Sequence, residues 1–295
     1  MRKAWQGSIV AIVTPFNIDG SIDYTAFDNL IEFHVENETD GIVVCGTTGE
    51  AATLNKEEYA NLIEHTVEKV NKRIPVIAGT GTNSTSEAIE NSCLAESLGV
   101  DGILVVAPYY NKPSRNGLKD YFTQISKAVS VPIVLYNVPG RTACNIPVDL
   151  VVELANELDN VVGIKEASGN LEQLACLLKD KPSDFMVFSG DDALAFQAVC
   201  MGADGVISVI ANIIPKEFHT LMNAAEKGDL NQARAIYFKY LKLIQLCFIE
   251  SNPIPVKTGL AVMDKLSEEF RSPMCRMIDD NRDLLVAEMR KQGLI

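Results

Sequence analysis

The sequence predicts an α/β fold, a (β/α)8 or TIM barrel followed by a C-terminal helical extension. Eight apolar runs of strand length occupy the first 210 of the 295 residues, and segments with helical spacing separate them. Near-continuous apolar strands are typical of parallel sheets that are covered on both faces, as in this barrel. A doubly wound open sheet is the alternative, but the turn after the first strand, residues 14–20, lacks the G-x-G-x-x-G dinucleotide motif.

Each predicted strand is a short apolar run bounded by glycine, proline or polar residues. The strands are 8–14, 41–45, 75–79, 102–107, 132–137, 161–165, 185–189 and 205–209. Amphipathic helices are predicted between them, for example over 56–70 and 85–98. Asn55 suits an N-cap before the first of these helices, and Ser84 or Thr85 suits one before the second. Gly99 and Gly202 follow helical segments as C-terminal stops.

The pattern changes after residue 209, where no further strand is predicted. One helix covers 215–226, Asp229 caps a long amphipathic helix that continues to 248, and two more helices begin near Pro255 and Pro273. We therefore expect a barrel catalytic domain over 1–227. Residues 228–295 would form a helical subdomain or an oligomer contact.

Composition argues against several classes of partner. The formal net charge is −13, from 39 acidic and 26 basic residues without a basic cluster, which argues against nucleic acid and anionic membranes as partners. The longest apolar runs are far shorter than the roughly 20 residues of a membrane span. The first seven residues lack the pattern of a signal peptide, so a cytoplasmic location is expected by default.

No metal site or disulfide framework is predicted. The three histidines stand singly in helix-like segments, without the spacing of metal ligands. The seven cysteines are an odd number and include no Cys-x-x-Cys pair, which indicates reduced thiols.

In a barrel of this kind, functional residues lie where strands end at their carboxyl side. The second strand is followed by Gly46-Thr47-Thr48-Gly49-Glu50, whose backbone N–H groups and hydroxyls could hold an anion. This stretch and 79–83 both lack the G-K-[ST] ending of a phosphate loop, and a tight turn that needs glycine explains either one about equally well. Tyr136 ends the fifth strand and could relay protons. Arg141, just past a Pro-Gly turn, suits a substrate carboxylate, or it is an ordinary surface arginine.

Lys165 ends the sixth strand, an apolar run in which a cation is unusual. Desolvation disfavours the charged form of an amine, and the neutral amine can form a Schiff base with a carbonyl substrate. Alternatively, the stem of Lys165 packs on the strand while its ammonium reaches water or pairs with Glu166. The hydroxyls, tyrosines and arginine at neighbouring strand ends favour the catalytic interpretation.

Three motifs resemble the signatures of one enzyme family, and the similarity to that family extends along the whole chain. They are Gly46-Thr47-Thr48-Gly49-Glu50, the stretch from Tyr136 to Thr142 (YNVPGRT), and the stretch from Gly163 to Gly169 (GIKEASG). They are similar to those of the 4-hydroxy-tetrahydrodipicolinate (dihydrodipicolinate) synthase family, a branch of the pyruvate-dependent class I aldolase superfamily that includes N-acetylneuraminate lyase. The resemblance implies condensation of pyruvate with L-aspartate 4-semialdehyde in the lysine and diaminopimelate pathway, without a metal or organic cofactor.

The resemblance also implies roles for individual residues. Lys165 would form the Schiff base with pyruvate, and Tyr136 would donate and accept protons in a relay with Thr47 and with Tyr110 from a neighbouring subunit. Binding contacts would come from Thr48, Ile207 through its backbone, Gly190 by leaving space near the amine, and Arg141 on the carboxylate of the second substrate. Simple turn geometry explains Gly190 equally well. A tyrosine shared across subunits implies at least a dimer, and the family is usually a tetramer, a dimer of dimers.

Bacterial members of the family are often inhibited by lysine at a site between subunits. The corresponding positions here are Ala51, Lys56, Tyr59, Asn83, Glu87 and Tyr109. Lys56 and Tyr59 stand where lysine-sensitive members often carry histidine, and a cation at position 56 that faced the site would repel a lysine ammonium, which argues against feedback control.

Two other functions stay open from the sequence. A sugar-acid lyase or dehydratase of the same superfamily would share Lys165 and Tyr136, but such enzymes usually lack an arginine corresponding to Arg141. A catalytically silent barrel that serves as a binding or scaffold protein is the other possibility.

Overall fold

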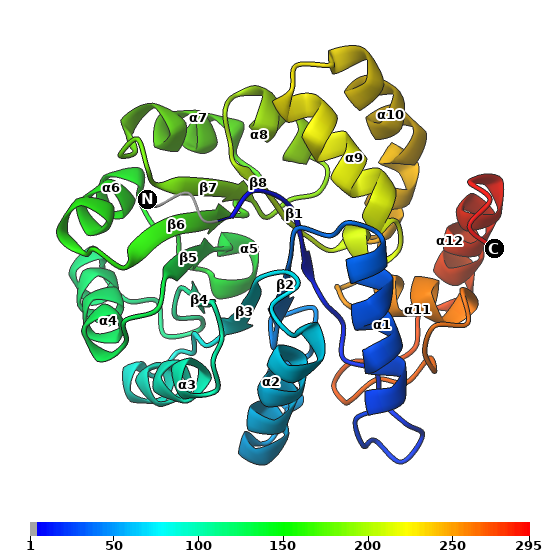
Figure 1. Cartoon of the computed structure of the whole chain (residues 1–295), viewed down its shortest axis with the longest axis horizontal. Coiled ribbons are helices and arrows are strands. Elements are labelled where there is room, and N and C mark those ends of the chain that lie inside the picture. The colour runs from blue at the N-terminus through cyan, green and yellow to red at the C-terminus, as the bar shows by residue number, and fades with distance from the viewer. Residues whose placement is uncertain (1–4) are drawn as a thin grey trace.

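Eight parallel strands pair in chain order and close on themselves, since β1 pairs with both β2 and β8 (Figure 1). The computed structural model describes residues 5–295. Residues 1–4, which the predictions for the N-terminal segment and the catalytic domain include, lie outside the described residues. The strands are β1 Gly7–Ala11, β2 Gly41–Val44, β3 Val76–Gly79, β4 Gly102–Val106, β5 Ile133–Asn137, β6 Val161–Glu166, β7 Met186–Ser189 and β8 Gly205–Ser208. The closed sheet confirms the predicted barrel and excludes the open sheet.

Helices surround the barrel and cover the outer face of the sheet (Figure 1). They are α1 Tyr24–Glu36, α2 Lys56–Val70, α3 Thr85–Ser97, α4 Arg115–Ala128, α5 Pro139–Thr142, α6 Val148–Glu157, α7 Leu171–Asp180, α8 Ala195–Cys200, α9 Pro215–Glu226, α10 Leu230–Leu246, α11 Ile254–Val262 and α12 Asp279–Lys291, with 3-10 turns η1 Ala51–Thr53 and η2 Ile210–Asn212. Among residues 5–295, no helix combines the length and apolarity needed to cross a membrane.

The helix ends follow the predicted caps with one exception. Asn55 forms a full capping box with Glu58 at the start of α2. Ser84 precedes α3 but makes no side-chain capping bond, because its hydroxyl is turned toward that of Ser86. Gly99 and Gly202 adopt φ of +85° and +103°, which favour glycine after a helix.

Two apolar clusters divide the core. One fills the barrel interior with Ile9, Val43, Leu104, Met186, Phe188 and their neighbours, and the larger one lies between the strands and the helices. Successive residues of a strand point to opposite faces, so alternate positions of each strand serve the two clusters. At the carboxyl end of β6, this alternation must place Lys165 and Glu166 on opposite sides of the sheet.

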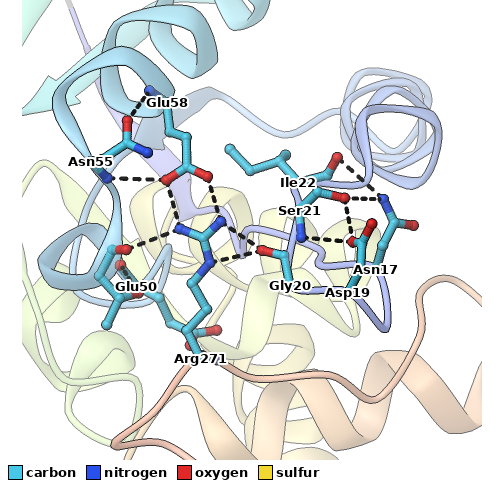
Figure 2. A network of polar contacts seen from close by, with 10 residues as sticks. Asn17, Asp19, Gly20, Ser21, Ile22, Glu50, Asn55, Glu58 and Arg271 are labelled. Atoms are coloured by element: carbon cyan, nitrogen blue, oxygen red, sulfur yellow. Dashed lines mark hydrogen bonds and ion pairs between the residues drawn. The ribbon is translucent and has the colours of Figure 1, made fainter.

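The C-terminal segment differs in detail from the prediction. The helix near Pro255 is present as α11, but the chain around Pro273 is not helical, and α12 begins only at Asp279. Arg271 explains the difference, because its guanidinium donates to the carbonyls of Gly20 and Thr53 and binds Glu58 (Figure 2). These contacts hold residues 263–278 as an irregular, non-helical connection against the barrel. The predicted division at 227/228 falls in the turn between α9 and α10, two helices that pack on each other.

Candidate active site

A pocket of about 460 Å³ opens at the carboxyl ends of the strands. Six predicted site residues line it: Thr47, Thr48, Tyr136, Arg141, Lys165 and Gly190. Ile207 lies deeper, among the apolar residues of the barrel interior. Tyr110 is absent from the pocket lining formed by residues 5–295, and 87% of it is exposed on the loop after β4.

Lys165 points from β6 into the base of this pocket and is only 5% exposed. It is in register with Tyr136 of β5, and its Nζ lies 4.5 Å from the centre of the Tyr136 ring. Among residues 5–295, no carboxylate forms an ion pair with it. The amine is therefore close to a phenol and open to the pocket, which is the environment expected for a nucleophilic lysine.

One interpretation of the sequence paired Lys165 with Glu166, but the structure shows no such contact. The Glu166 carboxylate accepts from the backbone N–H of Ser168 at 2.7 Å and from the amides of Asn137 and Gln173 at 2.9 Å each. These bonds lie on the outer side of the sheet, where Glu166 ties β6 to β5 and α7. The carboxylate thus stabilises the end of the strand without neutralising the amine.

Gly190, at the end of β7, leaves room for the stem of Lys165. A Cβ at this position would lie 2.9 Å from Cε and 3.0 Å from Cγ of Lys165, and 2.6 Å from Cβ of Ala167. Its φ lies outside the left-handed region, so turn geometry alone does not require glycine here. A side chain at position 190 would therefore collide with both Ala167 and the stem of Lys165.

The threonine loop, residues 46–49, brings two hydroxyls to the pocket. Thr47 is exposed there, whereas Thr48 is buried and accepts a hydrogen bond from Nδ2 of Asn252 at 2.9 Å. The flanking residues Cys45 and Glu50 both have a φ of +53°, so the turn uses left-handed backbone at two non-glycine positions. Gly46 and Gly49 adopt ordinary φ, which argues against the interpretation that the turn needs glycine for its conformation.

Arg141 lies on the short helix α5, at the mouth of the pocket. The amide of Asn137 accepts from the N–H of Ile146, which fixes the segment that carries α5. The Arg141 guanidinium donates through Nη2 to the backbone carbonyl of Asn252 at 3.1 Å, and Arg141 lines the pocket. This geometry leaves donors free for a carboxylate.

Sequence reasoning missed two buried groups beside this site. Asn252 contacts both Thr48 and Arg141, and its Oδ1 has no partner among the described residues. Asp192 accepts from the N–H groups of Val209 and Ile210 and so holds the end of β8; burial raises its pKa to about 6. Neither residue stands out in the sequence as a polar residue that ends an apolar run. Their contacts arise only when the fold brings β7, β8 and α11 together.

The six positions predicted for an effector site lie around η1, α2, α3 and the loop after β4. Lys56 is highly exposed and pairs with Glu90 at 3.4 Å. Tyr59 is buried and donates its hydroxyl to the carbonyl of Gly79 at 2.9 Å, and burial raises its pKa well above the ordinary value. Tyr109 is 39% exposed, and the backbone carbonyl of Asn83 accepts from Asn111. Within residues 5–295, Tyr59 uses its hydroxyl internally rather than presenting it at the surface.

No group of three His, Cys, Asp or Glu side chains in residues 5–295 is arranged to hold a metal ion. The pocket groups described above are an amine, hydroxyls, a phenol and a guanidinium.

The chain is similar to known proteins over nearly its whole length. The model of the dihydrodipicolinate synthetase family matches residues 4–292. A 4-hydroxy-tetrahydrodipicolinate synthase from Thermodesulfovibrio yellowstonii is 51% identical over 291 residues, which cover 99% of each chain. The crystal structure of dihydrodipicolinate synthase from Aquifex aeolicus superposes with a TM-score of 0.97 at 45% identity, over 98% of this chain and 99% of that one. The chloride-inhibited enzyme from Acinetobacter baumannii, complexed with pyruvate, gives a TM-score of 0.97 at 44% identity, over 99% and 100% of the two chains.

Proposed function

The chain belongs to the dihydrodipicolinate synthetase family, and from this membership we propose that its pocket condenses pyruvate with L-aspartate 4-semialdehyde on Lys165. The activity is that of a 4-hydroxy-tetrahydrodipicolinate synthase, a lyase of the class I aldolase type, in lysine and diaminopimelate biosynthesis. The observation that carries the residue assignment is the buried amine of Lys165, which faces Tyr136 and has no carboxylate partner in residues 5–295.

The covalent steps require only groups that face the pocket. Nζ of Lys165 adds to the keto carbon of pyruvate, and water leaves as the iminium forms. The iminium withdraws electrons from the methyl group, which loses a proton, and the resulting enamine attacks the aldehyde of the second substrate. The amino group of that substrate can then displace the lysine, which closes the ring and frees the enzyme.

Proton transfer is assigned to Tyr136, whose ring lies against the reacting amine. Thr47 lines the same pocket and would pass protons toward solvent, and Thr48 would contact the pyruvate carboxylate. Ile207, from the barrel interior beneath the pocket, would contribute its backbone. Arg141 would bind the carboxylate of the second substrate through the donors that Asn252 leaves free.

Tyr110 would complete the relay from a neighbouring subunit. It is 87% exposed, has a φ of +75°, and does not line the pocket formed by residues 5–295 of its own chain. A large exposed aromatic side chain on a strained loop suits insertion into a partner. We propose a homo-oligomer, a tetramer built as a dimer of dimers. Sedimentation of a fully active monomer would contradict the shared site.

Location and regulation stay predictions from the sequence. A cytoplasmic location fits the proposed biosynthetic role. Weak or absent inhibition by lysine is expected from Lys56, and calorimetry with L-lysine tests it; micromolar binding coupled to inhibition would contradict the expectation.

Trapping with borohydride tests the proposed function directly. Pyruvate followed by borohydride should leave a 1-carboxyethyl group on the amine of Lys165, detected by mass spectrometry of the peptide that holds it, and Lys165→Ala should abolish both the adduct and turnover. Lys179→Ala, which removes an exposed lysine that pairs with Asp180 at 3.4 Å, is the control and should behave as wild type. An adduct on another lysine, or wild-type turnover by Lys165→Ala, would disprove the assignment. Consumption of a 2-keto sugar acid in place of the semialdehyde would instead identify a related lyase.

A further inference from the structure

A buried ion pair lies directly behind the threonine loop. Nζ of Lys257, on α11, is 2.6 Å from Oε1 of Glu50, and the two side chains are 0% and 2% exposed. Glu50 follows Gly49, so the pair joins the residue just after the threonine loop to a helix beyond the barrel. Neither residue lines the pocket, and the proposed reaction uses neither of them.

The backbone at Glu50 is left-handed. A φ of +53° is unfavourable for a residue with a Cβ and costs about 1 kcal/mol or more, whereas glycine adopts it freely. Such a conformation persists where the surroundings impose it. A glutamate here gains nothing over glycine from the backbone, and the bond of its carboxylate to Lys257 is an interaction that offsets this cost.

Several further contacts come from the same C-terminal segment. Asn252 donates to Oγ1 of Thr48 at 2.9 Å, and the backbone N–H of Arg271 donates to Oε2 of Glu50 at 3.3 Å. Nζ of Lys257 also lies 4.4 Å from the ring centre of Phe16 and 4.9 Å from that of Phe270. Figure 2 shows Glu50 next to Arg271, whose guanidinium binds Glu58 and Gly20 nearby. Residues 252–271 therefore contact Thr48 of the threonine loop and Glu50, which follows the loop, from outside the barrel.

We propose that Glu50 and Lys257 are positioning residues that fix the hydroxyls of Thr47 and Thr48 against the Schiff-base lysine. This inference rests on the proposed function, because it concerns the geometry of that reaction. The pair acts through the backbone of the turn: the carboxylate is anchored to α11, which holds Glu50 left-handed and so sets the direction in which the two threonines project.

Stability alone is a weaker explanation for the pair. Removing two charges from water offsets most of their attraction, and replacing a buried ion pair with apolar groups of similar shape is often neutral or stabilising. Both side chains are almost fully buried, and burial lowers the pKa of Lys257 while Glu50 opposes the effect. What an apolar pair cannot reproduce is the directional bond that holds the left-handed turn.

Stability and geometry can be separated by variants of the pair. Lys257→Met leaves the Glu50 carboxylate buried and unpaired, so we expect strong destabilisation. The double variant Glu50→Gln/Lys257→Met removes both charges with little change of shape, and its melting temperature should return to within about 5 °C of wild type. Its kcat should nevertheless be lower by about ten- to a hundredfold, with a raised KM for pyruvate, because the hydroxyls are no longer held in place.

Glu58→Gln is the matched control. It weakens the ion pair with Arg271 in the same segment, while glutamine preserves the capping box of α2. The control should keep the kcat and KM of wild type. Each variant is assayed for turnover and for the rate of borohydride-trapped pyruvate adduct.

Three results would overturn the inference. The first is wild-type kinetics in the double variant, and the second is an equal loss of kcat in the Glu58→Gln control. The third is a double variant that is as unstable as Lys257→Met, because the pair would then serve to stabilise the fold. Failure of the proposed function is distinguishable, because the wild-type protein would then form no adduct on Lys165 and show no turnover of the two substrates.

Discussion

Replacing Gly190 by alanine should disturb the reacting amine without removing any functional group. The new Cβ would lie 2.6 Å from Cβ of Ala167 and 2.9 Å from Cε of Lys165. Carbon atoms prefer separations of about 3.5–4.0 Å, so the contacts must open by roughly 1 Å. Ala167 cannot rotate away, whereas the lysine stem can, and we therefore expect most of the shift to fall on Lys165.

The size of the effect follows from this displacement. A misplacement of about 1 Å in a catalytic group costs on the order of a hundredfold in rate. Overpacking by one methyl group destabilises a core by about 1–3 kcal/mol, which corresponds to a drop of several degrees in melting temperature. Because the φ of Gly190 lies outside the left-handed region, the substitution adds no backbone strain of its own.

The assay is the rate of trapped adduct formation with pyruvate, measured beside the melting temperature. Gly140→Ala is the control, because a Cβ there meets no atom within 4 Å and the residue lies in the short helix α5. We expect a much slower adduct in Gly190→Ala and wild-type behaviour in Gly140→Ala. Adduct formation at the wild-type rate in a folded Gly190→Ala protein would refute the view that this glycine makes room for the amine.

Three further predictions concern single side chains. Tyr136→Phe should still form the pyruvate adduct but lose about 10²–10⁴-fold in turnover, as expected for loss of an acid-base group; unchanged turnover would exclude it from the relay. Arg141→Ala should raise KM for aspartate 4-semialdehyde while leaving the rate of the pyruvate adduct unchanged, and equal effects on both substrates would contradict its assignment to the second one. His34 is fully buried, and desolvation lowers its pKa to about 3, so the unfolded chain binds its proton first and stability is lost as pH falls below about 6.5. Between neutral pH and pH 5, the free energy of unfolding measured in urea should fall by about 2 kcal/mol less in His34→Gln than in wild type. An equal fall in the two proteins would contradict this.

The fold could be predicted from local patterns because they repeat. Eight apolar runs with helical segments between them leave few architectures, and the closed sheet matches them. The connection around Pro273 was predicted wrongly as helix, because its conformation depends on Arg271 reaching Gly20 and Glu58, about 250 and 210 residues away in the chain. Long-range contacts of this kind leave no periodic signal in the segment itself.

The site could be predicted where its residues end strands. Thr47, Tyr136 and Lys165 each follow or close an apolar run, and strand ends converge in a barrel. Asn252 gave no such signal, since it precedes α11 outside the barrel and reaches the pocket only through the packing of that helix. The contribution of the C-terminal segment to the pocket therefore had to come from the structure.

Lys165 and Lys257 present the same signal in the sequence, a cation in an apolar run, yet the structure separates their roles. Lys257 is fully buried and bonded to Glu50, so its charge is matched and its amine cannot reach a substrate. Lys165 faces the pocket beside a phenol, while the adjacent Glu166 lies across the sheet and is bonded to amides. A lysine in an apolar run thus indicates a buried amine, and the surroundings of that amine decide its role. A lysine bonded to a carboxylate has a structural role, whereas a lysine that faces an open pocket can act as a nucleophile.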